Sequence, residues 1–224
     1  MKLDFHALSE SPLFAGIPEE DLQRLLACVS PKEKKYKRGS IIFCAGDDVR
    51  FVYYILSGSV HIINEDFWGN SSIVETMESD TLFGEAYVFS STQQHLVSVV
   101  AAEDLRVFEI NPSSLFSTCS KECSQHSQLV QNALFITSEK IVRLTEKLLH
   151  IMQRTLREKL LSYLTKCAQK EKSTSFYIPY SRQELADYLC VDRSALSHEL
   201  SRLQKTGMIL YRKNYFELLD VKEH

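Results

Sequence analysis

The chain has 224 residues, 44% of them hydrophobic, which is enough to bury one large or two modest cores. Its longest apolar run, Phe51–Leu56, is far shorter than the roughly 18 residues that cross a bilayer, and its N-terminus is polar rather than signal-like. We therefore expect a cytoplasmic protein with no membrane partner. The six cysteines form no Cys-x-x-Cys pair, which favours free thiols over disulfides.

The net charge of −3 combines two regions of opposite sign. Residues 1–152 carry 13 Lys and Arg against 20 Asp and Glu, a net charge of −7, whereas residues 153–224 carry 13 against 9, a net charge of +4. This asymmetry indicates an anionic partner for the C-terminal third, with nucleic acid as the leading candidate. A merely uneven surface is the alternative.

Between about residues 37 and 110, glycines and short polar segments separate runs of β-branched and aromatic residues. The clearest runs are Ser40–Cys44, Val52–Leu56, Val60–Ile63 and Ser72–Thr76. About eight short strands without an intervening helix predict an antiparallel barrel, sandwich or roll.

A helical region follows Pro112, since neither Gly nor Pro occurs between Ser113 and Ile178. Within it, apolar residues recur at the a and d positions of a heptad: Leu134, Ile141, Leu144, Leu148 and Ile151. A helix with such a stripe must bury it. Packing on the β-rich domain is one solution, and pairing with the same helix of a second copy is the one we favour.

The segment Tyr180–Ile209 predicts two short helices. Ser181 and Glu184 form a capping box, so the first helix should begin at Arg182, and Asp192 should cap a second helix that ends at Gly207. Apolar residues of the second helix face inward: Leu196, Leu200 and Leu203. Its outward face carries groups that suit phosphates and base edges, with Glu199 on the flank: Arg193, Ser194, Ser197, His198 and Ser201.

A strand, a basic turn at Arg212 and Lys213 and a second strand should follow, which is the hairpin that a winged helix-turn-helix needs. Together with Arg182 and Arg202, these residues complete the predicted DNA-binding surface. The alternative is a pair of ordinary core helices with a solvated face, and the basic hairpin argues against it.

The glycine-punctuated region ending in LFGEAYVF and the segment SRQELADYLCVDRSALSHELSRLQKTGMI, in this order, resemble the CRP/FNR family, the cyclic-AMP receptor protein and its relatives. The resemblance covers roughly residues 12–219 and implies an α+β chain. It implies a cyclic-nucleotide-binding-like β-roll in residues 1–112, a dimerisation helix and hinge in 113–153, and a winged helix-turn-helix domain in 154–224. Its implied partners are double-stranded DNA with a palindromic operator, a second copy, and RNA polymerase if the protein is an activator.

In this family an Arg-Glu pair at the start of the recognition helix, and an Arg four residues after the Glu, read the bases. This chain has Arg193, Ser194 and His198 at those places, so we expect an operator that differs from the usual one. Cys190 stands in the turn where glycine is usual. We expect either a strained left-handed residue or a right-handed turn with a half-buried thiol, and favour a space-filling thiol over a redox-reactive one.

Relatives that bind cyclic AMP resemble one another in Phe-Gly-Glu followed about ten residues later by Arg-Ser/Thr. Phe83, Gly84 and Glu85 match, but His95 and Leu96 stand where the Arg pair would be. A buried phosphate without a cation is costly, so we expect that cyclic AMP is not the ligand. A weak anion, a neutral or aromatic molecule, and no ligand at all stay open.

We expect no metal or cofactor. The first cysteine, Cys28, stands alone where an iron–sulfur cluster would need several, and a lone His61 or His95 is more typical of packing than of haem ligation. Three residues on one side of a helix could bind a metal, but no fourth ligand accompanies them: Cys119, Cys123 and His126.

Two other function classes stay open. One is a small-molecule-binding signalling module whose C-terminal domain docks a protein, and it differs from a DNA reader in the salt dependence of binding. The other is an enzyme with Glu85 and His95 as acid and base. No nucleophile, metal set or phosphate loop accompanies that pair, so we predict that the protein is not an enzyme.

Overall fold

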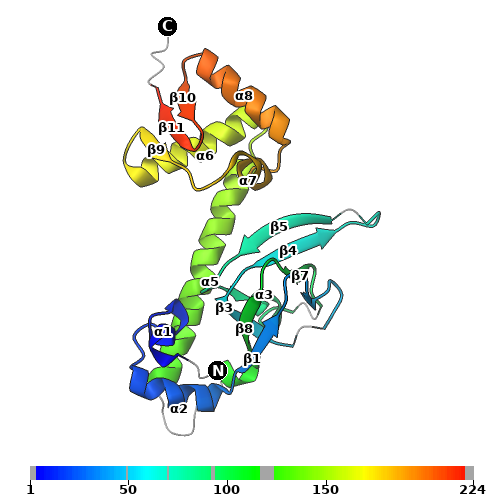
Figure 1. Cartoon of the computed structure of the whole chain (residues 1–224), viewed down its shortest axis with the longest axis vertical. Coiled ribbons are helices and arrows are strands. Elements are labelled where there is room, and N and C mark those ends of the chain that lie inside the picture. The colour runs from blue at the N-terminus through cyan, green and yellow to red at the C-terminus, as the bar shows by residue number, and fades with distance from the viewer. Residues whose placement is uncertain (1–3, 49, 70, 92–93, 117–123, 220–224) are drawn as a thin grey trace. The chain divides into compact units, whose positions relative to one another are not determined.

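The computed structural model in Figure 1 describes residues 4–48, 50–69, 71–91, 94–116 and 124–219. Contacts divide the chain into two compact units, Met1–Glu139 and Lys140–His224. Within the described ranges, no helix combines the length and the apolarity that crossing a membrane requires.

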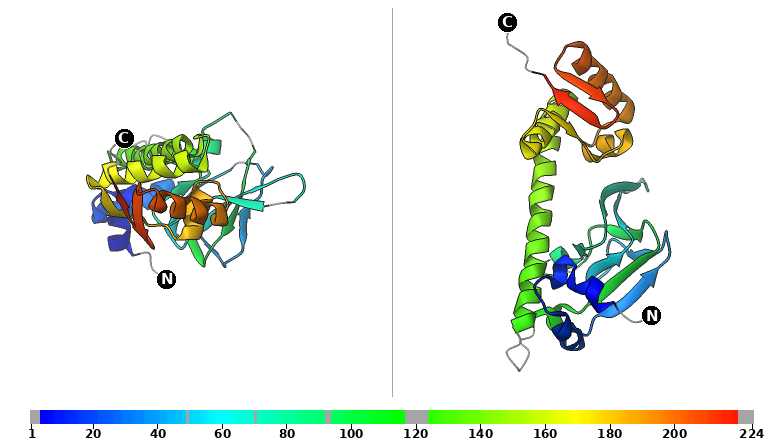
Figure 2. Two further views of the ribbon diagram at one scale, coloured as in Figure 1. Left: turned by 90° about the horizontal axis from the view of Figure 1, so that it is seen from above. Right: turned by 60° about the vertical axis from the view of Figure 1, so that its left-hand side comes forward.

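The first unit contains two four-stranded sheets whose neighbouring strands are all antiparallel (Figure 2). The order of one sheet is β1 (Lys32–Tyr36), β8 (Leu105–Ile110), β3 (Val52–Ser57) and β6 (Leu82–Phe83). The order of the other is β2 (Ile41–Phe43), β7 (Ser98–Ala101), β4 (Val60–Glu65) and β5 (Ser71–Met77). Alternating side chains from both sheets form one apolar core, which includes Ile55, Val60, Phe83, Val99 and Val107. The predicted antiparallel roll is confirmed, but the expectation of no intervening helix was wrong, because α3 (Glu85–Val88) lies between β6 and β7.

Strand β1 was not predicted, because four of the five residues in KEKKY are charged. It lies at the edge of its sheet, where β8 is its one neighbour among the described strands. An edge strand can keep charged side chains in water, and lysines there also discourage pairing with other chains. The charge pattern that hides this strand in the sequence is therefore compatible with its place in the fold.

The helices of the first unit are α1 (Phe5–Ser9), the 3₁₀ turn Pro12–Phe14, α2 (Glu19–Val29), α3 (Glu85–Val88), α4 (Pro112–Phe116) and the start of α5 (Ser124–Ile151). Leu13, Phe14 and Leu22 are buried in one cluster with Leu129 and Ile136 of α5. Asn132 of α5 joins them through two hydrogen bonds, donated to the carbonyls of Leu13 at 3.0 Å and Ala15 at 2.8 Å. This amide satisfies the buried carbonyl of Leu13 and the partly buried carbonyl of Ala15.

The second unit holds the end of α5 and a small domain: α6 (Leu156–Glu171), β9 (Ser175–Tyr177), α7 (Arg182–Tyr188), α8 (Arg193–Lys205), β10 (Ile209–Arg212) and β11 (Tyr215–Leu218). The strands form an antiparallel sheet in the order β10-β11-β9. Leu185, Leu196, Leu200, Leu203 and Phe216 are fully buried in its core. The predicted helix pair and hairpin are confirmed.

Local capping explains where these helices begin. The capping box of Ser181 and Glu184 is present, and the Asp192 carboxylate accepts from the backbone N–H groups of Ser194 at 2.7 Å and Ala195 at 2.9 Å. A hydrogen bond from the Ser194 hydroxyl, together with these two backbone hydrogen bonds, holds the pKa of the Asp192 carboxyl below its usual value. Gly207 follows α8 with a φ of +71°, as predicted for a helix terminator.

Candidate nucleic-acid interface and roll interior

Helix α8 presents a polar face to solvent. Arg193, Ser194, His198 and Ser201 are exposed and Ser197 is half-buried, so the structure brings the five predicted residues to one side of the helix. Ser197 Oγ donates to the Arg193 carbonyl at 2.9 Å, and Ser201 Oγ donates to the Ser197 carbonyl at 3.0 Å. Because these hydroxyl protons are used within the helix, the serines offer lone pairs outward.

Glu199 does not lie on the flank as predicted; that expectation was wrong. The residue is 7% exposed, and its position between Leu196 and Leu203 continues the inward stripe of α8. Arg202 Nη1 lies 3.5 Å from Glu199 Oε2. The carboxylate therefore orients Arg202, whose own side chain remains 58% exposed at the edge of the polar face.

The hairpin after α8 places Arg212 and Lys213 in solvent, at the turn between β10 and β11. Arg182 lies beside it rather than free in solution. Its guanidinium carbon is 5.2 Å from the ring centre of Tyr211, and Nη2 donates to the Lys213 carbonyl at 3.3 Å. Burial lowers the pKa of Arg182. The structure thus gives Arg182 a supporting contact with the hairpin, in addition to any contact with DNA.

Cys190 lies in the tight turn between α7 and α8. Its φ is +54°, so the left-handed alternative is the one adopted, and its side chain is exposed. The expectation of a half-buried, space-filling thiol was wrong. A left-handed turn leaves the cysteine with a backbone cost that a glycine would not have.

We expect Cys190→Gly to raise the free energy of unfolding by about 1 kcal/mol, because it removes the steric cost of the left-handed backbone. Cys190→Val should lower it, since a β-branched residue is poorly tolerated there. Urea unfolding under reducing conditions measures both. Cys190→Ala is the control that removes the thiol and keeps the strained backbone. A stabilisation by Ala equal to that by Gly would contradict this account.

The roll interior contains most of the residues matched to the nucleotide cassette. Phe83 is 1%, Glu85 4% and His95 4% exposed. Gly84 has a φ of +82°, and a Cβ there would lie 2.9 Å from the carbonyl oxygen of Phe51, so glycine is required sterically. Leu96 differs from the prediction, because its side chain is 68% exposed and lies outside this buried set.

His95 is packed against aromatic rings. Its ring is stacked on Phe43 with centres 3.7 Å apart and meets Tyr87 edge-on at 5.0 Å. No partner for Nδ1 occurs among the residues that the structure describes. Burial lowers the pKa of His95, and the nearby Asp47 opposes this only in part. At neutral pH the position matched to the family's arginine therefore carries no positive charge.

The lowered pKa of His95 predicts a pH dependence of stability. Below pH 6.5 the unfolded chain takes up a proton that the folded ring resists, so stability falls as the pH drops through this range. We expect His95→Phe, which keeps the ring stack, to lose less stability than the wild type between about pH 7.5 and 5.5. Thermal unfolding across this range measures the difference. Parallel curves would contradict the assignment.

Of the three soft ligands that were considered for a metal and set aside, Cys119 and Cys123 lie outside the described residues. His126 is buried, with Nε2 2.9 Å from the Leu115 carbonyl and Nδ1 3.8 Å from Cys28 Sγ. His61 Nδ1 lies 3.0 Å from Thr76 Oγ1. Among residues with a described position, no three side chains of the metal-binding types gather into a site.

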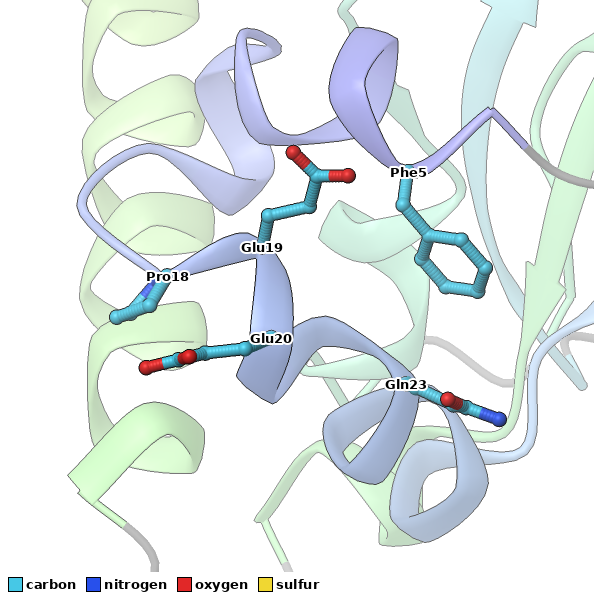
Figure 3. A pocket seen from close by; sticks show the side chains of 5 residues that line it. All are labelled: Phe5, Pro18, Glu19, Glu20 and Gln23. Atoms are coloured by element: carbon cyan, nitrogen blue, oxygen red, sulfur yellow. The ribbon is translucent and has the colours of Figure 1, made fainter.

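A surface depression of about 490 Å³ lies between α1 and the start of α2. Figure 3 shows its lining, with Phe5 on one side and Pro18, Glu19, Glu20 and Gln23 around it. Two carboxylates on its wall disfavour phosphate, and no residue of the nucleotide cassette lines it. It is therefore distinct from the roll interior.

Residues 33–122 match the cyclic nucleotide-binding domain family, and residues 158–223 match the Crp-like helix-turn-helix domain family. Among curated proteins, the chain is 24% identical to the regulatory protein HlyX of Actinobacillus pleuropneumoniae over 222 residues, which cover 97% of this chain and 90% of HlyX. It is 25% identical to the cAMP-activated global transcriptional regulator Vfr of Pseudomonas aeruginosa, covering 79% and 84%.

Solved structures share the fold. The c-di-GMP responsive global regulator CLP of Xanthomonas campestris matches with a TM-score of 0.61 at 20% identity, covering 91% of this chain and all of CLP. CprK complexed with OCPA matches with a TM-score of 0.66 at 12% identity, covering 89% of each chain. The two domains and their order define a DNA-binding transcription regulator rather than an enzyme. The chain belongs to the CRP/FNR family.

Proposed function

We propose that the protein acts as a homodimer that reads a palindromic operator, with α8 of each copy in a major groove and the β10–β11 hairpin on the neighbouring backbone. The observation that carries this proposal is the joint exposure of the polar α8 face and of Arg212 and Lys213 in one domain. Arg193 and His198 supply hydrogen-bond donors for base edges, while Arg212 and Lys213 supply charge for phosphates.

An exposed apolar stripe on α5 supports the dimer. Leu134, Ile141 and Leu148 recur every seven residues and are 66%, 58% and 50% exposed. A second row with the same spacing is also exposed: Phe135, Val142 and Leu149. Leu144 is 42% exposed at the margin, whereas Ile151 is half-buried. The stripe is therefore broader than the predicted a/d seam and reaches Met152. The same stripe on a second copy is a matching cover.

The roll is the proposed effector domain, and we infer an effector other than cyclic AMP. A cyclic nucleotide would place its phosphate near His95, which stands where the family has its arginine and which carries no charge at neutral pH. Without a guanidinium, that burial would leave the phosphate charge uncompensated. If the protein activates transcription, RNA polymerase is its further partner.

We expect Arg193→Ala to weaken binding to the selected operator by about 1–3 kcal/mol, and binding to random DNA by less, because a base contact discriminates between sequences. The operator is first selected from random duplexes with purified protein, and affinities are then measured by fluorescence anisotropy at several salt concentrations. Lys205→Ala, an exposed cation at the far end of α8, is the matched control.

An equal loss of affinity for the operator and for random DNA would show that Arg193 contacts a phosphate and not a base. An affinity that does not depend on salt, or no binding to any duplex, would contradict DNA reading and favour a domain that docks protein.

We expect the double substitution Ile141→Glu and Leu148→Glu to abolish the dimer, because it places like charges in a self-complementary apolar seam. Sedimentation measures the oligomeric state, and operator binding should be lost with the dimer. Ile73→Glu on β5 is the control, since Ile73 is 56% exposed outside the stripe. A double variant that still sediments as a dimer would contradict this interface.

A further inference from the structure

At the end of α5, apolar side chains are exposed while a polar one is buried. Leu149 and Met152 are 57% and 67% exposed, yet the polar His150 between them is 5% exposed. All of its described contacts lie within the second unit. An apolar side chain would fill this position equally well. Because the buried ring of His150 carries polar nitrogens, those nitrogens need a hydrogen-bond partner.

That partner is on α6. His150 Nδ1 lies 2.8 Å from Ser162 Oγ, and the ring meets Tyr163 edge-on with centres 5.8 Å apart. The ring also lies 6.3 Å from Tyr188 of α7. Burial lowers the pKa of His150, so its ring is neutral and shares one hydrogen bond with the serine hydroxyl at neutral pH.

Two further contacts tie the preceding turn of α5 to the same helices. Lys166 of α6 lies 2.9 Å from the Glu146 carboxylate, and the Lys147 ammonium lies 5.5 Å from the ring centre of Tyr188. Both involve exposed or half-exposed groups and contribute modestly. The part-buried hydrogen bond between His150 and Ser162 is less accessible to water than these two contacts and contributes more to the geometry. Since α7 packs on α8, this cluster connects the end of α5 with the reading helix.

We propose that His150 is a positioning residue whose hydrogen bond with Ser162 fixes the winged helix-turn-helix domain on the end of α5 and thereby sets the spacing of the half-sites that the dimer reads. This rests on the proposed dimeric DNA reading. In a dimer joined through α5, both copies contain the junction between α5 and α6. Movement at this junction would change the distance between the two α8 helices, so a loose junction should let the dimer bind operators with altered half-site spacing.

The test uses the full-length protein, its selected operator, and operators in which the half-site spacing is changed by one or two base pairs. The wild type should bind the altered operators at least about tenfold more weakly. In His150→Ala and Ser162→Ala the ratio of the affinity for the selected operator to the affinity for the altered operators should shrink to about threefold or less, because the hydrogen bond between these two residues is lost. The double variant should match the single ones, and His150→Asn, which keeps a polar atom at the Nδ1 position, should retain part of the ratio.

His61→Ala is the matched control, because it removes another histidine–hydroxyl pair, His61 and Thr76 in the roll, and should leave the ratio unchanged. Thermal unfolding shows that each variant is folded. An unchanged ratio in both folded variants, or an equal loss of affinity on every operator, would overturn the positioning role. A wild-type protein that selects no operator would instead overturn the proposed function itself.

Discussion

The two-sided character of α5 is the constraint on which the rest of the structure depends. One side of the helix is buried in the first unit through Leu129 and Ile136, and Asn132 satisfies the carbonyls of Leu13 and Ala15. The other side leaves Leu134 and Ile141 in solvent. A helix that is apolar on two sides needs two covers, and the described part of this chain supplies one of them. The exposed side is therefore the observation on which the proposal of a dimer rests.

Two buried histidines, His95 and His150, are uncharged rings at neutral pH. His95 occupies the position matched to the family's arginine, but it is held by stacking on Phe43 rather than by an anion. His150 is held by a hydroxyl and two tyrosine rings. Burial lowers the pKa in both cases, so each ring remains neutral where a permanent cation would be costly. The departure from the cyclic-AMP cassette therefore lies at His95, since a neutral ring there cannot balance the charge of a phosphate as an arginine would.

Local rules made much of the second unit predictable. Ser181 with Glu184 and Asp192 marked both helix starts, because a cap depends on residues only three positions apart. Charge alone was a poorer guide. Strand β1 was missed because an edge strand tolerates charged side chains on both faces. Glu199 was predicted on the flank because it is charged, but its spacing from Leu196 and Leu203 places it on the inward face of α8, where it is buried. Cys190 could be narrowed to two turn forms, but only the tertiary structure selects the left-handed one.

The hydrogen-bond state of the α8 face bears on what kind of operator it can read. The hydroxyl protons of Ser197 and Ser201 are donated within the helix, and that of Ser194 goes to Asp192, so all three serines accept rather than donate. Arg193 is then the strong donor, suited to the two acceptors of a guanine, while the serines suit the amino groups of adenine or cytosine. His198 adds its two ring nitrogens to this face. The three positions that the resemblance matches to the family's Arg-Glu-Arg pattern therefore hold one guanidinium, one hydroxyl that accepts and one imidazole, and this difference follows from the hydrogen bonds within the helix as much as from the residues themselves.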